Sequence, residues 1–391
     1  MKKLICYISM ALLISCNLES ELNDVFSIDI NKFEHGNILL TDITDKIAYI
    51  PFENQFPIGF IYTYKISDNF IYAAIKNVGV VKFSKNGKLI RKYGKIGRGP
   101  GEYLFCLRFA VDEKTETVYV MDHKMNDIEV YNNNGDHIRN IKLPEDADGF
   151  QLDAIEFFGS SLFMAQSINM GRGDHDWVIL DTLGNIITKK RNPYPEFEGR
   201  MGGRTTLSEF NGNILYWDNF KDTVFHVHPD FTWSPVCVLL KGEHKFPMTT
   251  AGYNPPDEFF KKVSNYMILY TVLETYKFFI LKYELNSTQK LAVIDKKSGI
   301  ATVMDLPDSE NGIENDLDNG LPFQPDKYFE IGNEKYLASL IQPYELKAHI
   351  ASRNFKESKP KYPKKKEKLE QLANRLNEND NPVLMLLKLK E

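Results

Sequence analysis

The sequence predicts an all-β fold, a β-propeller of about six blades preceded by a lipoprotein signal peptide. Three observations support this prediction: a short aromatic-centred strand pattern that occurs six times, glycine turns spaced 48 and 49 residues apart, and an apolar N-terminal segment that ends in a cysteine. Repeated units of several short strands are typical of propeller blades, because a single small sheet buries both faces only by stacking on its neighbours.

Residues 1–15 are expected to form the signal peptide. Two lysines precede an apolar stretch at 4–14, which is too short to span a bilayer. The sequence Leu13-Ile14-Ser15-Cys16 resembles a bacterial lipobox, in which cleavage before the cysteine allows its acylation. We therefore expect Cys16 to anchor an outer-membrane lipoprotein of the cell envelope. Whether it faces the periplasm or the exterior stays open, and an ordinary secretory signal is the alternative.

The composition excludes nucleic acid as an expected partner. A formal net charge of −5 over 391 residues leaves no strongly basic character of the kind that nucleic-acid-binding proteins use. Once Cys6 is removed and Cys16 is acylated, only Cys106 and Cys237 remain, and both lie in apolar runs. Two buried free thiols are therefore expected, with a disulfide bond between them as the alternative.

Two repeated elements indicate the blades. The first is an apolar strand with a central aromatic residue, found at Ile71–Ala73, Val118–Val120, Leu162–Met164, Ile214–Tyr216, Phe278–Ile280 and Tyr336–Ala338. The second is an alternating strand, a tight turn and another strand, with Gly87, Gly135 or Gly184 in the turn. Asn-Gly and similar pairs supply the positive φ that a hairpin requires. A β-sandwich or a solenoid with coincidental turn spacing is the alternative.

The mature chain divides into three parts. Residues 16–40 are expected to form an N-terminal tether and first strand, residues 41–355 the six-bladed propeller, and residues 356–391 a closing segment. Mixed apolar spacing over residues 257–276 predicts a short helix inserted between blades.

The closing segment has three expected elements. A lysine-rich linker at 356–368 is expected to be solvated, with contact to an anionic membrane surface as the alternative. A helix with an apolar face at 369–376 then ends at Asn381-Pro382. The apolar run Val383–Leu389 is expected to pair with residues 47–52 and to close the ring.

One stretch carries a family resemblance. Gly97-Arg98-Gly99-Pro100-Gly101-Glu102-Tyr103, together with Ile50–Glu53, Asn315–Gly320 and Asp380–Leu384, resembles the six-bladed β-propeller lipoproteins of Bacteroides-type bacteria, which are related in architecture to NHL-repeat propellers. The resemblance covers most of the mature chain and implies the fold. It implies no reaction and no catalytic residues.

The glycine-rich stretch supplies the first binding candidates. Three glycines and a proline fix an unusual backbone path, which suits a connection between blades. Arg98 and Glu102 are expected to be able to pair across the loop. We favour the connecting role, while a ligand contact by Arg98, Glu102 and Tyr103 at the propeller mouth is the functional alternative.

A second group of candidates is the sequence Asp174-His175-Asp176. It is expected in a polar loop, where two carboxylates and an imidazole would bind a cation or act as an acid/base pair. A solvated loop without function is the favoured alternative.

No linear motif indicates catalysis or a resident metal, so no catalytic residue and no cofactor are predicted. Calcium and zinc are the ions left open. Asp316 and Asp318 have the spacing of a partial calcium loop, and His226 and His228 share one strand face. In both places a purely structural or solvated role is favoured.

Together these features predict a membrane-anchored extracytoplasmic binding or scaffold propeller for a peptide, glycan or partner protein. The alternative is a propeller hydrolase or lyase with a metal in its channel, whose residues would come singly from several blades. Clustered His, Asp, Glu or Arg side chains in the channel would favour the enzyme.

Overall fold

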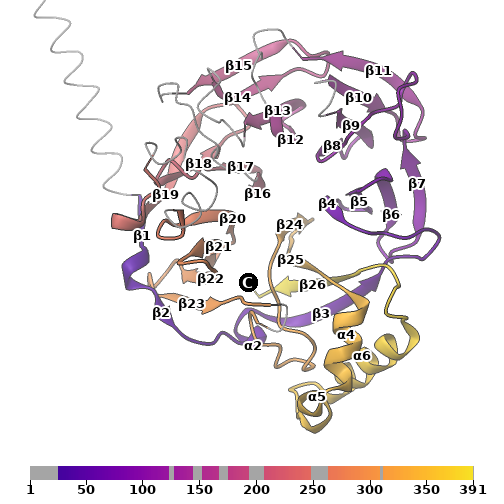
Figure 1. Cartoon of the computed structure of the whole chain (residues 1–391). Helices are drawn as coiled ribbons and strands as arrows, with labels where there is room; N and C mark the ends of the chain where they lie inside the picture. Colours follow the sequence, from indigo (N-terminus) through magenta and orange to yellow (C-terminus); the bar gives the residue numbers. More distant parts are fainter. Residues whose placement is uncertain are drawn as a thin grey trace, which may run out of the picture.

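The structure is a computed structural model that describes residues 25–122, 127–143, 152–166, 175–192, 207–247, 263–308 and 311–390. Its strands form six sheets of four or five strands each. The sheets stand side by side around a common centre, which is the arrangement of a β-propeller (Figure 1). The all-β fold expected from the sequence is therefore confirmed.

We number the sheets in chain order. Sheet 1 contains β4 (Ile61–Ile66), β5 (Phe70–Ile75), β6 (Gly79–Ser84) and β7 (Leu89–Tyr93). Sheet 2 contains β8 (Phe109–Asp112), β9 (Thr117–Asp122), β10 (Asp127–Tyr131) and β11 (His137–Lys142). Sheet 3 contains β12 (Leu152–Phe158), β13 (Ser161–Gln166), β14 (His175–Leu180) and β15 (Ile186–Arg191).

The second half of the chain forms the other three sheets together with one N-terminal strand in each. Sheet 4 contains β16 (Ser208–Phe210), β17 (Asn213–Tyr216), β18 (Thr223–Val227), β19 (Trp233–Leu240) and the N-terminal β1 (Phe26–Asp29). Sheet 5 contains β20 (Ile268–Glu274), β21 (Phe278–Leu285), β22 (Thr288–Asp295), β23 (Ala301–Asp305) and β2 (Glu34–His35). Sheet 6 contains β24 (Lys327–Ile331), β25 (Glu334–Ile341), β26 (Val383–Leu389) and β3 (Thr44–Pro51).

The three glycine turns found in the sequence are equivalent hairpins. They join β6 to β7, β10 to β11 and β14 to β15. Gly87, Gly135 and Gly184 have φ values of 80°, 79° and 95°, and in each turn the glycine N–H donates to the carbonyl oxygen three residues earlier. A side chain is strained at such φ values, so glycine at this position fixes the register of the two strands.

Sheet 6 joins the two ends of the chain. Strand β26 lies between β25 and β3 and is antiparallel to both, with Leu386 opposite Ala48. The pairing expected for residues 383–389 and 47–52 is present, with β3 covering Thr44–Pro51. Antiparallel pairing on both sides leaves β26 without a free edge.

The N-terminal segment runs along the outside of two further sheets. Strand β1 is parallel to β19, with Phe26 opposite Cys237, and β2 is parallel to β23, with Glu34 opposite Thr302. A 3-10 helix, η1 (Ile30–Lys32), connects them. The part of the expected tether from residue 26 onward is therefore bound to sheets 4 and 5 (Figure 1).

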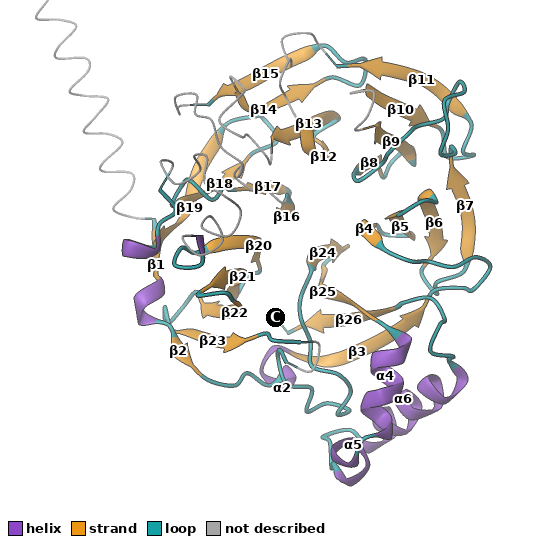
Figure 2. Cartoon of the chain, viewed as in Figure 1, coloured by secondary structure: helices purple, strands orange, loops and turns teal. Residues whose placement is uncertain are grey.

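The helices lie mainly outside sheet 6, as Figure 2 shows. They are α2 (Leu40–Ile43), α4 (Pro343–Ala351), α5 (Arg353–Glu357) and α6 (Pro363–Arg375), and a second 3-10 helix is η3 (Gly242–His244). No helix in the described part of the chain is long and apolar enough to cross a membrane.

Two expectations about helices were wrong in part. The lysine-rich residues 356–368 are mostly exposed, as expected, but they do not form a linker, because Pro363 begins α6 and buried Leu369 holds it against the body of the protein. Part of the predicted helix at 257–276 is strand β20, whose side chains are mostly buried. Because a strand covered on both faces lacks clean alternation, its apolar run resembles a helix in the sequence. Residues 257–262 lie outside the described residues.

The central channel as candidate functional site

The innermost strand of every sheet borders a common cavity. Strands β4, β8, β12, β16, β20 and β24 each form one edge of their sheet, and residues in or beside them line a cavity of about 400 Å³. These six strands surround the centre of the molecule (Figure 1). The cavity is the central channel of the propeller, and its size is within the range of small-molecule sites.

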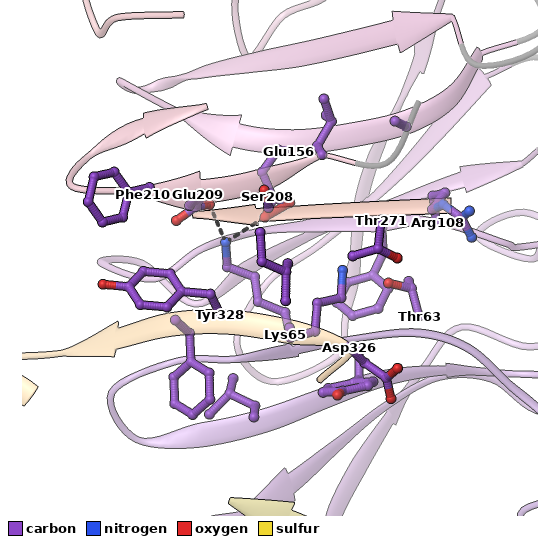
Figure 3. A pocket seen from close by; sticks show the side chains of 18 of the residues that line it. Thr63, Lys65, Arg108, Glu156, Ser208, Glu209, Phe210, Thr271, Asp326 and Tyr328 are labelled. Atoms are coloured by element: carbon purple, nitrogen blue, oxygen red, sulfur yellow. Dashed lines mark hydrogen bonds and ion pairs between the residues drawn. The ribbon is translucent and has the colours of Figure 1, made fainter. Parts of the chain in front are cut away.

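A lysine joins four sheets inside the channel. The Nζ atom of Lys65 on β4 lies 2.9 Å from carboxylate oxygens of both Glu156 on β12 and Glu209 on β16, and 3.9 Å from Glu113, which follows β8. Figure 3 shows the Lys65 side chain extending across the channel toward the first two. We call these four residues the Lys65 cluster. It brings one ammonium group and three carboxylates together.

Burial and charge set the proton affinities of this cluster. Burial raises the pKa of Glu156 to about 7, although the Lys65 ammonium opposes this shift. Burial acts to lower the pKa of Lys65, but attraction to Glu156, Glu209 and Glu113 outweighs it and the pKa is raised. Burial also acts on Glu209, yet Lys65 holds the pKa of that carboxyl below its usual value. The cluster therefore holds a permanent cation and a carboxyl that titrates near neutral pH.

We expect the stability of the protein to fall by about 2 kcal/mol as the pH rises from 5 to 7.5. Glu156 binds its proton more tightly in the folded state than in the unfolded chain, so its contribution is full below pH 4.5 and is lost as the pH rises through about 7. Glu209 has a lowered pKa, so its own contribution changes only below this window. When Glu156→Gln is unfolded with urea at several pH values between 5 and 7.5, its free energy of unfolding should fall less with pH than that of the wild type.

The matched control for this measurement is Glu370→Gln. Glu370 is exposed on α6, far along the chain from the cluster. A slope that is equally reduced in both variants would contradict the assignment to Glu156.

The channel also contains two cations that are not paired with carboxylates. Lys327 begins β24 and Arg108 directly precedes β8, and both line the cavity. Neither has an ion-pair partner within the described ranges, although Arg108 Nη1 donates to the Leu107 carbonyl oxygen at 3.1 Å. Burial lowers the pKa of Lys327, aided by the like charges of Arg108 and Lys65, although attraction to the Glu156 carboxylate opposes the shift. The neighbouring Asp326 carboxylate is already paired, at 2.7 Å, with Lys282.

Arg108 and the Glu209 carboxylate lie in different parts of the channel. In Figure 3, Arg108, Thr63, Thr271 and Asp326 lie on one side of Lys65, while Glu209 lies on the other. We call the first side the Arg108 end. An anion that entered there would meet Arg108 and the Asp326 carboxylate, which is paired with Lys282, before it met Glu209.

The glycine-rich loop connects sheet 1 to sheet 2 and leads to Arg108. Tyr103 is buried; its hydroxyl accepts from the Val80 N–H at 2.9 Å and donates to the Tyr93 carbonyl oxygen at 2.7 Å. The Glu102 carboxylate accepts from the Gly99 N–H at 2.8 Å. These bonds fix the loop from within, which is the connecting role favoured from the sequence.

Arg98 does not pair with Glu102 as expected. It is exposed, and none of Arg98, Glu102 and Tyr103 lines the channel cavity. The Glu102 carboxylate instead lies over Gly97 and Gly99 of its own loop. A ligand contact by these three residues stays a prediction.

The structure places the second group of candidates differently from the expected loop. Asp174 and Cys16 lie outside the described residues, whereas His175 and Asp176 belong to strand β14. Asp176 is buried, and its Oδ2 atom lies 3.0 Å from the Lys190 ammonium and 2.6 Å from that of Lys221. The expectation of a solvated loop was therefore wrong, because both residues lie in a strand and Asp176 belongs to a buried ion-pair network that joins sheets 3 and 4.

The remaining polar candidates are also used within the fold. Asp316 accepts from the Thr41 N–H at 2.9 Å, and Asp318 accepts from the Gly320 N–H at 2.9 Å. His226 lies 2.6 Å from Glu274 rather than in solvent. Across the residues that the structure describes, no group of three or more His, Cys, Asp or Glu side chains is arranged to hold a metal ion.

The two cysteines are buried and unpaired with each other. Cys106 belongs to the connection that leads to Arg108, and burial raises the pKa of its thiol. Cys237 is in β19, and burial raises the pKa of its thiol too. Both groups are therefore protonated at neutral pH, in agreement with the expected free thiols.

Comparison with known proteins identifies the family. A family model described as a domain of unknown function, DUF4934, matches residues 25–388. The chain belongs to the DUF4934 family. No curated protein matches the sequence.

Solved structures resemble this DUF4934 chain in fold. One is a Bacteroides fragilis protein described as exported, with a TM-score of 0.69 and 17% sequence identity, covering 94% of this chain and 100% of that one. Another is a member of the DUF4221 family from Bacteroides vulgatus, with a TM-score of 0.49 and 12% identity, covering 89% of this chain and 97% of that one.

Sequence reasoning missed the channel residues of this DUF4934 chain, although a signal for two of them exists. Lys65 lies opposite Tyr72, and Glu156 lies opposite Phe163, so each charge faces the central aromatic of the repeated strand. A charged residue within an apolar strand just before that repeat marks the channel in these two sheets. Arg108 and Lys327 have no such signal. Arg108 directly precedes β8 and Lys327 is the first residue of β24, so neither lies within an apolar strand.

Proposed function

We propose that this protein is a lipid-anchored, extracytoplasmic binding protein, a six-bladed propeller that holds a small anionic ligand in its central channel. The carrying observation is the pair of cations, Arg108 and Lys327, that line the cavity without carboxylate partners among the described residues. Charged groups removed from bulk water are normally paired, so two adjacent unpaired cations favour an anion from outside the chain.

The location rests on the N-terminal sequence. The lipobox-like residues 13–16 support acylation of Cys16, and the fold is shared with a Bacteroides fragilis protein that is described as exported. The outer membrane is the membrane we propose. The lining residues that the structure describes all lie between Ile61 and Leu340, well after Cys16, so the binding test is designed without lipid.

The test is titration calorimetry of the chain from residue 17 onward with glucuronate, benzoate and the peptide Ala-Ala-Ala. We expect at least one carboxylate to bind, and the double variant Arg108→Met/Lys327→Met to bind it at least tenfold more weakly, because hydrogen bonds to charged groups contribute about 1.5–3 kcal/mol. Affinity should also fall as salt is added.

The matched control is Lys88→Met/Lys142→Met, which removes the same charge from two exposed lysines. Binding that is unchanged in the channel variant, or equally weakened in the control, would overturn the proposal. So would the absence of binding by every carboxylate in the set.

One observation favours a second function, an acid/base hydrolase or lyase. The channel contains clustered acidic and basic side chains, and Glu156 has a pKa near that of an efficient general acid or base. If the protein turns over a bound ligand, Glu156→Gln should abolish product formation while binding persists. Products would be followed by mass spectrometry of the ligand after incubation.

A further inference from the structure

Three aromatic side chains form a row whose middle member, Tyr62, lines the channel cavity. The ring centroids of Phe60 and Tyr62 are 5.4 Å apart, and those of Tyr62 and Phe105 are 5.8 Å apart, both edge to face. Phe60 is 59% exposed, whereas Tyr62 and Phe105 are half-buried. Tyr62 lines the cavity, and the rings of Phe60 and Phe105 contact its ring from either side.

A backbone irregularity presents the middle ring to the cavity. In the pairing of β4 with β5, Ile61 lies opposite Ile75 but Thr63 lies opposite Ala74, so Tyr62 is the extra residue of a β-bulge. Bulges redirect a side chain and occur often beside binding sites. Tyr62 lines the channel cavity.

The third ring is fixed by the glycine-rich connection. The residues on either side of Phe105 are both held: the Leu104 N–H donates to Asp122 at 2.7 Å, and the Cys106 Sγ lies 3.3 Å from the Arg108 carbonyl oxygen. The segment that carries Phe105 therefore also carries Arg108. One rigid connection thus places an aromatic ring and a cation three residues apart.

Hydroxyl groups complete this end of the cavity. Thr63 and Thr271 line it, and Figure 3 shows both on the same side as Arg108. Neither hydroxyl has a hydrogen-bond partner in the part of the chain that the structure describes, and neither is enclosed. They are available to a ligand that carries its own hydroxyl groups.

We propose that the Arg108 end binds an acidic saccharide, a uronic acid residue of a glycan. This proposal rests on the proposed function and names its ligand class. The C–H face of the sugar ring packs on Tyr62 and its neighbours Phe60 and Phe105, while the carboxylate reaches Arg108 and Lys327. The threonine hydroxyls bond to sugar hydroxyls.

The combination of groups separates this ligand from other anions. A simple carboxylate would use the two cations but not the row of rings. An aromatic acid would use rings and cations but would leave the hydroxyls of Thr63 and Thr271 without partners. A uronic acid uses all three, since its ring has an apolar face, a polar edge and a carboxylate.

The experiment compares digalacturonate with a neutral galactose disaccharide, benzoate and Ala-Ala-Ala on the chain from residue 17 onward. We expect digalacturonate to bind at least tenfold more tightly than each of the others. Tyr62→Ala and Phe60→Ala should each weaken it about tenfold, whereas Tyr344→Ala, which removes an exposed aromatic from α4, should not. Melting temperatures of all variants show whether each one folds.

A second measurement needs no variant. Saturation of the aromatic protons of the wild-type protein should transfer to the ring protons of digalacturonate in an NMR difference spectrum. Equal binding of benzoate or the peptide, or aromatic variants that bind digalacturonate as well as wild type, would overturn the saccharide inference. If Arg108→Met/Lys327→Met still lost carboxylate binding in that case, the proposed function would stand.

Discussion

A chain truncated after Pro382 is expected not to fold. The deletion removes β26, whose register pairs it with β25 on one side and with β3 on the other. Val383, Leu384, Met385 and Leu387 of this strand are fully buried, so their apolar surface and both sets of backbone hydrogen bonds are lost together. Circular dichroism and size-exclusion chromatography of the truncated chain should show an unfolded or aggregated protein.

Single substitutions test the same strand without deleting it. Leu387→Ala should lower the free energy of unfolding by about 2–5 kcal/mol, since it empties a fully buried position. Leu386→Ala, one residue earlier at a partly exposed position, should cost clearly less. A truncated chain that unfolds cooperatively at the wild-type temperature would show that β26 does not close the ring.

Replacement of Lys65 by methionine is expected to lower the free energy of unfolding by about 2–3 kcal/mol at pH 7.5. The change leaves Glu113, Glu156 and Glu209 without their shared cation. We place the effect at the lower end for broken buried pairs because Glu113 and Glu209 are 40% and 43% exposed to the channel and partly screened. Chemical unfolding of both proteins measures the difference.

The pH dependence distinguishes repulsion from lost packing. As the pH falls toward 5, Glu156 takes up its proton, so the penalty of Lys65→Met should shrink. In the double variant Lys65→Met/Glu209→Gln, one of the repelling carboxylates is gone and part of the stability should return. A penalty that is the same at both pH values and in both backgrounds would show that the charge of Lys65 is unimportant.

The parts of the fold with local signals were predictable from the sequence. Each hairpin turn is determined by one glycine at positive φ, and the closing strand is an isolated apolar run after Asn381-Pro382. Asn381 itself holds the junction, because its side chain accepts from the Ile58 N–H and donates to the Glu53 carbonyl oxygen. The helix at residues 363–375 was predicted only in part, because the lysines in its first half indicated a solvated linker.

The site was not predictable in the same way. The four members of the Lys65 cluster come from four sheets, and up to 144 residues separate two that touch. Lys65 and Glu156 are single charges among apolar neighbours, whereas Glu113 lies between Asp112 and Lys114 and looks like an ordinary charged turn. Only the closed ring brings the four residues together. The glycine-rich stretch was a binding candidate in the sequence, but its residues form the connection between two sheets. Arg108, five residues after Tyr103, is the residue that lines the channel.

The path of the N-terminal segment determines how a mechanical load reaches the ring. Between residue 26 and β3, the chain is paired first with β19 and then with β23, so a pull on the N-terminal end acts on these outer edges before it acts on the closing sheet. The pairings with sheets 4 and 5 would therefore bear the force before the pairing between β3 and β26 does. A propeller anchored by this end would withstand repeated pulling while the pairing of β3 with β26 stays intact.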